Sequence, residues 1–593
     1  MRPRGPVLAA MSAPTGPLTV EPTVPRPDVA PCIVELFNET ALTGFDSFSY
    51  TPPPACPPPW AKVVFEMDMA SVTRTGSVAN LRVGLSHPDD GDFVLFMGAP
   101  QIHSGLNRWR VERDLTDYAS LLAQPELPGL IEHTWDNSSP SVDEDVVTGS
   151  ARIKFYPPTV AQPAPSVPDV MFTHAHAYRM PRNIVRAYVE VLAQGLDEIG
   201  TSDRLWYTCT PDFYLEIHPG LNNPFTIGDD WGATLSSSPM GCNSPSHREV
   251  EVLLDGVVVG TAPIFPWLPS NLHRRFADSV DKPVPSAQAL NFIPYRVDVT
   301  PIASLLNDGA LHTLSLRVAG DYSASATHFQ VDGKLLAWVD PDRAIVTGAV
   351  TRNTYAPPPT VGPTGGFCAQ DIDTVTCNIE NVVKQRYSID GYVDTSAGRV
   401  YSTVDTRYDF KNVQRIFADG IFYPNHRGYK QALDMDSRVH TTSERRLGGV
   451  TLARDVVDVR YPFKLVYVSA GRMVDNGEGG YIAQIDSIAA QVDQAREQKI
   501  DMRRGTVHYT SQLRDAFAGE HRRNNVTGTD PVWQSQREYA FRDSLGDCFA
   551  ARRTTVAGSL ATASTGAGCP GGLNRMSWFV RPDGSPENMG WVP

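Results

Sequence analysis

The sequence predicts a multidomain, all-β protein held together by disulfides. Three observations lead to this prediction. Short runs that alternate apolar and polar residues, separated by Pro, Gly, Asn and Asp, dominate the chain. Helical periodicity is scarce. The eight cysteines, taken in order, fall into four local couples. Many short strands with frequent turns are typical of β-sandwiches and barrels.

Length and composition are those of a globular protein with several cores. At roughly 100–200 residues per domain, a chain of 593 residues is expected to form three or four domains. Hydrophobic residues make up 41% and charged residues 20%, which is not a disordered composition. The net charge of −14, with no basic stripe, argues against nucleic acid as a partner. No apolar run approaches the roughly 18–20 residues that cross a bilayer.

The cysteine couples predict four disulfides. Zinc ligation is the rival interpretation, but there is no C-x-x-C motif and no His pair beside any couple. Disulfides persist in oxidising compartments, so we expect a secreted or periplasmic protein. The couples are Cys32 with Cys56, Cys209 with Cys242, Cys368 with Cys377, and Cys548 with Cys569.

Proline-rich stretches divide the chain into blocks. Residues 1–29 are expected to be a disordered leader, whose apolar patch is too short for a secretory signal. Two β blocks, 30–158 and 168–345, are separated by a Pro-rich linker. A Pro- and Gly-rich stretch, 356–366, leads into a third β block, 366–593.

Individual strands follow from the alternation of side chains. Examples are residues 62–69, 185–192, 248–254 and 399–405. The dipeptide Asp255-Gly256, followed by three valines, predicts a type I′ hairpin. Residues 482–501 have apolar side chains at spacings of three and four and form the one good candidate for an amphipathic helix.

The first two blocks contain a repeated phrase. Residues 111–116 (VERDLT) match residues 295–300 (YRVDVT), and each phrase combines a strand with Asp-apolar-Thr. A short Leu-rich segment follows in both cases, at 118–122 (YASLL) and 302–306 (IASLL). We therefore expect a duplicated β-sandwich unit; the alternative is a chance likeness of strand and turn patterns.

Further phrases form an ordered series along residues 30–470. They are Cys32 with YTPP at 50–53 and Cys56-Pro57, WRVERDLT at 109–116, PRNIVRA at 181–187, WYT at 206–208, REV at 248–250 with LDG at 254–256, and YPFKL at 461–465. No single phrase is diagnostic, but the series resembles the acid peptide-N-glycosidases, the PNGase A-type amidases of plants, fungi and bacteria.

The resemblance implies two tandem jelly-roll β-sandwich domains, with the active site in the cleft between them, followed by a C-terminal β-rich domain. It also implies a hydrolase that cleaves the amide between an asparagine and the first N-acetylglucosamine of an N-glycan, so that Asn becomes Asp. The substrates would be N-glycosylated proteins or glycopeptides. We expect no cofactor, no metal, no membrane partner, and a monomer.

This chemistry requires a carboxylate that orients or deprotonates water and donors that face the developing oxyanion. The simplest family carboxylates are missing here. Relatives have an Asp-Arg pair before a strand of the first jelly roll, where this chain has Gly76 and Ser77. A second acidic position falls on Ser244, and a third, in an acid-Thr-Trp phrase, falls on His133. Either other carboxylates act, or the activity has been lost.

Two pairs of residues are candidates for the catalytic groups. Asp68 and Glu66 share one face of a strand, and such an acidic pair can raise one pKa; a solvated strand face is the alternative. Glu132 and His133 lie beside Trp135, whose ring could stack on a sugar or belong to the core.

Two further groups could be catalytic or bind a metal. The loop at 87–92 (HPDDGD) could hold calcium or act in catalysis, although an exposed hairpin turn is the simplest interpretation. His174 and His176 alternate on one strand face, with no third metal ligand in view. The loop contains His87, Asp89, Asp90 and Asp92.

Substrate binding is expected to involve six residues, Trp135 and five others. Arg82 and Arg248 are donors for the carbonyl oxyanion or for glycan hydroxyls, and Asn80 lies on the strand of Arg82. Trp206 and Tyr207 belong to a family phrase and would form a sugar platform, with a core role as the alternative.

Two other functions stay open at this point. The missing carboxylates suggest a glycan- or glycoprotein-binding protein without activity on the same scaffold. The large third block suggests a structural or adhesive surface protein. The Cys209–Cys242 disulfide is expected beside the cleft, close to Arg248. The sequons at Asn38, Asn137 and Asn525 matter only in a host that glycosylates.

Overall fold

The computed structural model describes residues 19–576, with gaps at 43, 74–76, 89–90, 100, 103–104, 136–145, 161, 175, 196–201, 209, 212–240, 243–245, 269–279, 321–328, 358–364, 421–426, 476 and 478–480. The predicted all-β class is confirmed. The described α-helices, α1 (Ala119–Leu122) and α3 (Ala303–Leu306), have only four residues each. No described helix is long and apolar enough to cross a membrane.

The first β-sandwich consists of two antiparallel sheets, named sheet A and sheet B here. Apart from the hairpin β4–β5, consecutive long strands lie in opposite sheets. Sheet A has the order β1 (Cys32–Leu42), β9 (Val146–Tyr156), β3 (Lys62–Thr73) and β7 (Gly105–Asp114). Sheet B has the order β2 (Phe45–Tyr50), β8 (Leu127–Trp135), β4 (Ser77–His87) and β5 (Gly91–Gly98), with β6 (Gln101–Ile102) beside β4.

The second sandwich repeats this strand order in sheets C and D. Sheet C has the order β10 (Val170–Thr173), β19 (Phe329–Val339), β12 (Ile184–Gly195) and β17 (Tyr295–Asp298). Sheet D has the order β11 (Ala177–Arg179), β18 (Leu311–Ala319), β15 (Glu249–Leu254) and β16 (Val257–Pro263). Between β12 and β15 lie η3 (Ser202–Thr208) and the short parallel pair β13 (Thr210–Pro211) and β14 (Gly241–Cys242).

The predicted duplication is confirmed by this strand order and by the turns and hydrogen bonds that follow equivalent strands. The helical turns η1 (Thr116–Tyr118) with α1, and η5 (Thr300–Ile302) with α3, follow equivalent strands. In the first copy, the Thr116 backbone N–H donates to Asp114 Oδ1 at 2.9 Å. In the second, the Thr300 N–H donates to Asp298 Oδ1 at 2.9 Å. The Asp-apolar-Thr phrase therefore forms the same hydrogen-bonded turn in both sandwiches.

The predicted hairpin between β15 and β16 is confirmed. Asp255 has φ of 51° and Gly256 has φ of 80°. A type I′ turn requires positive φ at both central residues, which explains why Asp-Gly stands there.

The third block forms one large antiparallel sheet of 11 strands. Five of its strands, β22 to β26, have 21 to 26 residues, against roughly 3–10 in most proteins. Its first strand precedes the Pro- and Gly-rich stretch, so the sheet begins earlier than the predicted third block. The strands are β20 (Thr347–Asn353), β21 (Gly365–Gln370), β22 (Thr374–Thr395), β23 (Gly398–Asp419), β24 (Arg427–Leu447), β25 (Val450–Asp475), β26 (Tyr481–Arg504), β27 (Val507–Asn524), β28 (Thr529–Asp543), β29 (Cys548–Val556) and β30 (Ser559–Thr565), followed by η6 (Pro570–Gly572).

The predicted helix at 482–501 is wrong, because this segment lies in β26. Its buried residues Ile488, Ala490 and Val492 also follow a period of two, which the spacings of three and four concealed. Neighbouring strands β25 and β27 pair with the segment along its length. Pairing on both sides decides between two patterns that the local sequence left ambiguous.

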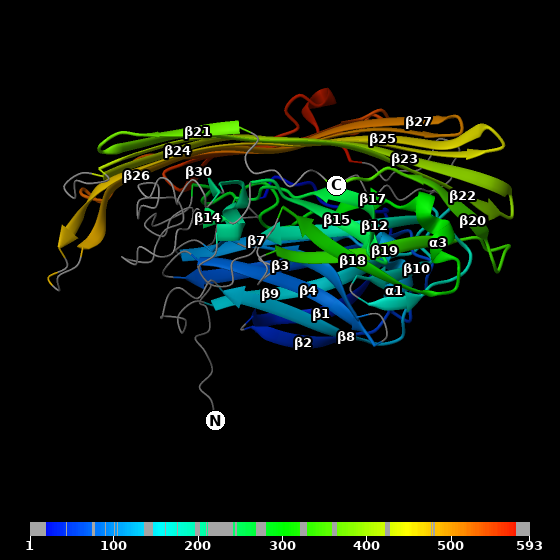
Figure 1. Ribbon diagram of the computed structural model, residues 1–593. Helices are drawn as coiled ribbons and strands as arrows, with labels where there is room; N and C mark the ends of the chain where they lie inside the picture. The colour runs from blue at the N-terminus through cyan, green and yellow to red at the C-terminus, as the bar shows by residue number, and fades with distance from the viewer. Residues whose placement is uncertain are drawn as a thin grey trace.

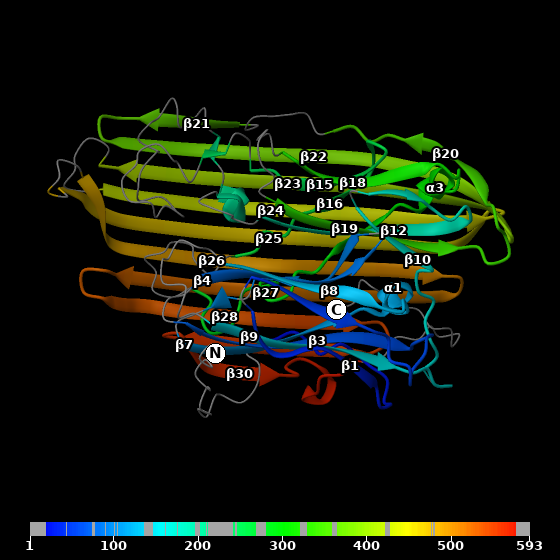
Figure 2. The same ribbon diagram turned by 90° about the horizontal axis from the view of Figure 1, so that it is seen from below.

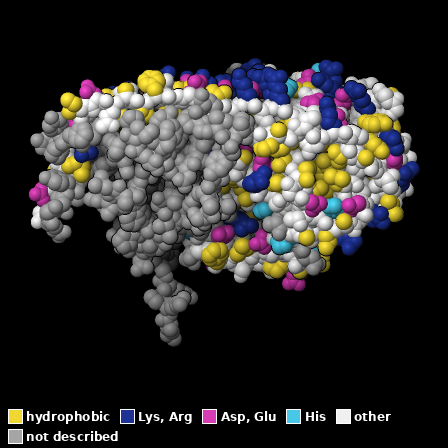
Figure 3. Space-filling model, viewed as in Figure 1, with side chains coloured by type: hydrophobic (Ala, Val, Ile, Leu, Met, Phe, Trp, Pro, Cys, Tyr) yellow, Lys and Arg dark blue, Asp and Glu magenta, His cyan; other side chains and the backbone are white. Residues whose placement is uncertain are grey.

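The large sheet covers both sandwiches (Figure 1). Viewed from below, its long strands extend past the sandwiches at both ends (Figure 2). Its inner face shares a buried cluster with the second sandwich. Along the upper edge in Figure 3, Lys and Arg side chains gather with Asp and Glu among them. Pairs such as Arg438 with Asp458, at 2.5 Å, join adjacent strands.

Three of the predicted disulfides are present in the described residues. They are Cys32–Cys56, Cys368–Cys377 and Cys548–Cys569. Cys209 and the side chain of Cys242 lie outside the described residues, so the fourth disulfide stays a prediction.

The described part of the leader does not have the expected disorder. Val20 packs into a buried cluster with Leu513 and Tyr539 of the large sheet, and Glu21 pairs with Arg537 at 2.7 Å. A few residues later, Val24 packs against the first sandwich. Residues 19–29 therefore form a strap between the large sheet and the first sandwich.

Candidate functional site

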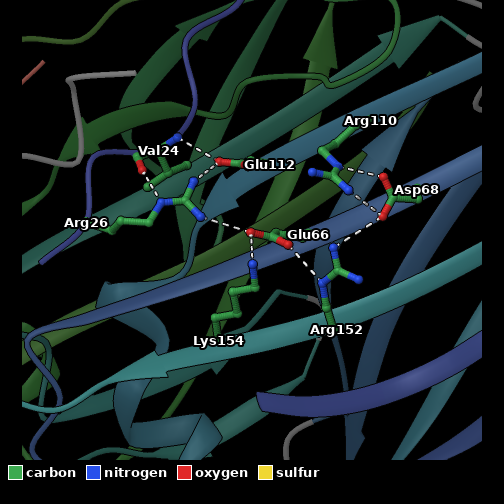
Figure 4. Close-up of polar contacts among 8 residues, drawn as sticks. All are labelled: Val24, Arg26, Glu66, Asp68, Arg110, Glu112, Arg152 and Lys154. Atoms are coloured by element: carbon green, nitrogen blue, oxygen red, sulfur yellow. Dashed lines mark hydrogen bonds and ion pairs between the residues drawn. The ribbon is translucent and has the colours of Figure 1, made fainter. Parts of the chain in front are cut away.

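The predicted acidic pair Glu66 and Asp68 lies on the outer face of sheet A (Figure 4). Glu66 is only 2% exposed and accepts hydrogen bonds from three cations: Arg26 at 2.9 Å, Arg152 at 2.9 Å and Lys154 at 2.6 Å. Burial raises the pKa of Glu66, but these three donors outweigh burial and hold the pKa below its ordinary value.

Asp68 belongs to the same network. Arg110 donates to it twice, at 2.6 Å and 2.9 Å, and Arg152 bridges it to Glu66 with a contact of 3.3 Å. Arg26, from the strap, also pairs with Glu112. Both carboxylates are therefore ion-paired, Glu66 with three cations and Asp68 with two arginines. Their ion pairs link β3 to β7, to β9 and to the strap.

Glu132 and Arg82 lie on the opposite outer face of this sandwich, on sheet B. They are direct partners in the β4–β8 register, and Arg82 Nη1 donates to Glu132 Oε2 at 3.3 Å. Their side chains are 24% and 22% exposed. Asn80 stands two residues from Arg82 on the same face of β4. Because a sandwich core is about 10 Å thick, Glu132 and Asp68 cannot act on one bond.

His133 points the other way from Glu132, into the sandwich. It is 2% exposed, and burial lowers its pKa to about 4. A buried imidazole, largely neutral at this pKa, therefore stands where the resemblance leads us to expect an acid. The backbone of Trp135 pairs with Ala79, and its side chain lies outside the described residues.

The two histidine groups singled out in the sequence meet at the junction of the sandwiches. The β4–β5 hairpin, which carries His87 and Asp92, contacts the loop between β10 and β11. Gly91 has φ of +79°, and a Cβ there would lie 2.8 Å from His176 Nε2, so a larger residue would strain the turn and displace the imidazole. Asp92 accepts from the Ser86 hydroxyl at 2.5 Å. Asp89 and Asp90 lie outside the described residues.

No group of three or more His, Cys, Asp or Glu within the described parts of the chain is arranged to hold a metal ion. His87, Asp92, His174 and His176 all belong to those parts. The calcium and two-histidine metal interpretations thus have no support from the described residues.

A narrow crevice lies at the same junction. Its volume is about 150 Å³, and both sandwiches line it, with His87 and Phe93 on one side and Met171 and Phe172 on the other. His174 comes two residues after Phe172 of this wall, and its electrostatic neighbours include Asp332, Lys334 and Arg82. Arg82 of the first sandwich, which pairs with Glu132, is thus an electrostatic neighbour of His174 of the second.

Below this rim the sandwiches are joined by buried charges. Tyr118 donates to Glu190 at 2.6 Å, and Arg296 pairs with Glu190 at 2.6 Å and with Asp117 at 2.5 Å. Burial raises the pKa of Glu190, but Arg296 and its other cationic neighbours bring it down to about 2. This network fixes how the two walls face each other.

Trp206 and Tyr207 are core residues and not a sugar platform. They are 1% and 0% exposed and pack between the second sandwich and the large sheet, with the Tyr207 ring 4.4 Å from the Phe463 ring. Tyr207 Oη donates to the Trp267 carbonyl at 3.0 Å. A ring without an exposed face cannot stack on a ligand.

Arg248 is likewise buried, with 2% of its surface exposed, and it donates to the His247 carbonyl at 2.8 Å. Direct contact with a substrate would require this side chain to become exposed. Of the six predicted binding residues, Arg82 and Asn80 lie on the outer face of sheet B, and the side chain of Trp135 lies outside the described residues.

The fold and the junction define a class: tandem β-sandwiches whose shared rim carries polar side chains from both copies. Residues 158–356, which span the second sandwich and β20, match the family described as peptide N-acetyl-beta-D-glucosaminyl asparaginase amidase A. The resemblance seen in the sequence pointed to the same PNGase A-type family. No curated protein and no solved structure gives a significant match to the chain.

Proposed function

We propose that the protein is a peptide-N-glycosidase that hydrolyses the asparagine–N-acetylglucosamine amide of N-glycosylated proteins or glycopeptides. The family match across the second sandwich carries this proposal. Two features support it: the rim between the sandwiches holds a carboxylate, Glu132, beside a guanidinium, Arg82, and both side chains are partly exposed.

In the proposed reaction, Glu132 accepts a proton from water as the water oxygen bonds to the amide carbon. Arg82 orients Glu132 and stabilises negative charge on the carbonyl oxygen. The C–N bond then breaks, and the proton passes to the departing nitrogen. The products are aspartate and a glycosylamine, and water later converts the glycosylamine into the free glycan and ammonia.

The second candidate is a protein that binds glycans without cleaving them. The observation that favours it is His133, a buried neutral residue where the family phrase has an acid. Under both functions we expect an exported protein, because the three described disulfides are typical of oxidising compartments. We also expect it to work as a monomer.

The test is hydrolysis of an N-glycosylated peptide in water labelled with heavy oxygen, at acidic and neutral pH. Mass spectrometry should show free glycan and a peptide whose aspartate carries one heavy oxygen. A peptide that binds the protein but stays glycosylated would overturn the amidase proposal in favour of the binding function. Glycan release without label in the peptide would exclude attack of water on the amide carbon.

A further inference from the structure

His174 is clamped to the opposite strand of its own sandwich by two hydrogen bonds. Its backbone N–H donates to the Gly333 carbonyl at 2.9 Å, and the Gly333 N–H donates to the ring atom Nδ1 at 3.2 Å. Both bonds involve the backbone of β19, so the ring is held by a rigid element and not by a mobile side chain.

The second bond fixes the tautomer of the ring. An Nδ1 atom that accepts a hydrogen bond carries no proton, so the neutral ring has its proton on Nε2. Burial lowers the pKa of His174 and favours this neutral form; Asp332 and the Gly333 backbone oppose the shift, while Lys334 and Arg82 add to it. His174 is therefore a neutral donor with a defined direction.

The donor atom remains accessible. Within the described residues, Nε2 has no hydrogen-bond partner, and it is not one of the buried polar atoms left unsatisfied there. It therefore reaches the surface of the rim. Arg82, from the other sandwich, is close enough to affect the charge state of His174.

We propose that Nε2–H of His174 donates a hydrogen bond to the carbonyl oxygen of the glycosylated asparagine side chain, together with Arg82. This inference rests on the proposed function. A neutral imidazole can stabilise an oxyanion without giving up its proton. The two donors would come from different sandwiches, so the oxyanion site exists only when the sandwiches are docked.

Gly333 is the positioning residue of this arrangement. A Cβ at this position would lie 2.7 Å from Leu316 Cδ1 and 3.4 Å from His174 Cβ. Gly333→Ala must displace Leu316 or the backbone that holds Nδ1. We expect this variant to lower kcat while KM changes little, because the ring would be misdirected and not lost.

The tautomer can be tested without any activity. Nitrogen-15 NMR of the full-length protein with labelled histidine, compared with His174→Gln to assign the signal, should show an unprotonated Nδ1 and a protonated Nε2 at neutral pH. A protonated Nδ1, or an imidazolium signal, would overturn the inference whether or not the protein is an enzyme.

The role can be tested by kinetics on a glycopeptide. His174→Ala should lower kcat/KM about 100-fold, in the range of other oxyanion donors, whereas His174→Gln, which retains an N–H donor, should keep most of the activity. His508→Ala, at an exposed site on the large sheet, is the matched control. Unchanged kcat/KM for a folded His174→Ala would refute the role.

If the wild-type protein releases no glycan, the proposed function fails but this site can still be judged. Binding of the intact glycopeptide is then measured by calorimetry. His174→Ala should weaken binding about tenfold, the loss expected for one hydrogen bond. Equal affinity of wild type and His174→Ala would overturn the site as well.

Discussion

Glu132 and Asp68 have the same charge and lie on opposite faces of one sandwich, which makes them a matched pair for mutation. Glu132→Gln should lower glycopeptide hydrolysis at least about 100-fold, because it removes the proposed base. Asp68→Asn should leave the rate nearly normal, because its partners Arg110 and Arg152 tie it to sheet A. Rates are measured by mass spectrometry of the released glycan.

The reverse result would also be informative. Suppose that Glu132→Gln leaves the rate of glycan release unchanged and that Asp68→Asn is folded but inactive. The reaction would then take place on the outer face of sheet A, which the strap covers. Melting curves of both variants distinguish loss of chemistry from loss of fold.

Glu249 is a buried carboxyl whose two oxygens have no hydrogen-bond partner among the described residues. Burial raises its pKa from an ordinary value of 4.5 to about 8, and the nearby Glu251 adds to the shift. Between these values the folded protein keeps a proton that the unfolded chain has lost. Stability is therefore full below pH 4.5 and falls as the pH rises toward 8.

The loss should be at most about 1.4 kcal/mol per pH unit. Glu249→Gln removes this titration, so we expect the variant to gain stability relative to the wild type as the pH rises from 5 to 8. Thermal unfolding of both proteins across this range measures the difference. A constant difference over the whole range would show that Glu249 does not titrate between the two states.

The strap of residues 19–29 acts as an element although it has no regular secondary structure. Arg26 donates to Glu66 at 2.9 Å and to the Val24 carbonyl at 2.9 Å, and the Val24 N–H donates to Glu112 at 2.8 Å. These bonds explain why a Pro-rich segment is ordered: its charges complete an ion-pair network in sheet A.

Arg26→Ala should free the strap and destabilise the protein by about 1–3 kcal/mol, because Glu66 and Glu112 lose a charged donor in a buried setting. Limited proteolysis should then cut between residues 19 and 31 faster than in the wild type. Arg446→Ala, which breaks an exposed pair with Glu444, is the control and should change neither measurement. Equal cutting of all three proteins would contradict the strap.

At the scale of the whole molecule, the large sheet is the base on which the second sandwich rests. Trp206 and Tyr207 fill this junction, where Asn412 of β23 donates to the Tyr207 carbonyl at 2.7 Å. Burial across this surface fixes the second sandwich, and the buried charges at Glu190 and Arg296 then fix the first sandwich against it.

Trp206→Ala should destabilise the protein by about 3–5 kcal/mol because it leaves a cavity in this core. The folded fraction should bind glycopeptide with wild-type affinity, because the ring touches no ligand. Denaturant unfolding and calorimetry measure the two effects. A stable variant with weakened binding would restore the interpretation of Trp206 as a sugar platform.

The sequence alone determined the all-β class, the repeated sandwich unit and the Asp-Gly hairpin. These features depend on neighbours in the chain: alternation along a strand, the Asp-apolar-Thr turn, and positive φ at two adjacent residues. The segment 482–501 shows the limit, because its pattern fits both a helix and a strand until β25 and β27 pair with it.

Only the tertiary structure decided which polar residues meet. The period of two places Glu66 and Asp68 on the same face of one strand. It cannot tell which outer face of a sandwich contacts the next domain, so it gives no sign that Arg82 and His174 are neighbours. Strand pairing with β9 and the strap surround Glu66 with cations. Docking of the sandwiches makes Arg82 an electrostatic neighbour of His174, more than 90 residues away in the chain. Strand patterns follow from local sterics, whereas a site between domains depends on surfaces that become neighbours only after folding.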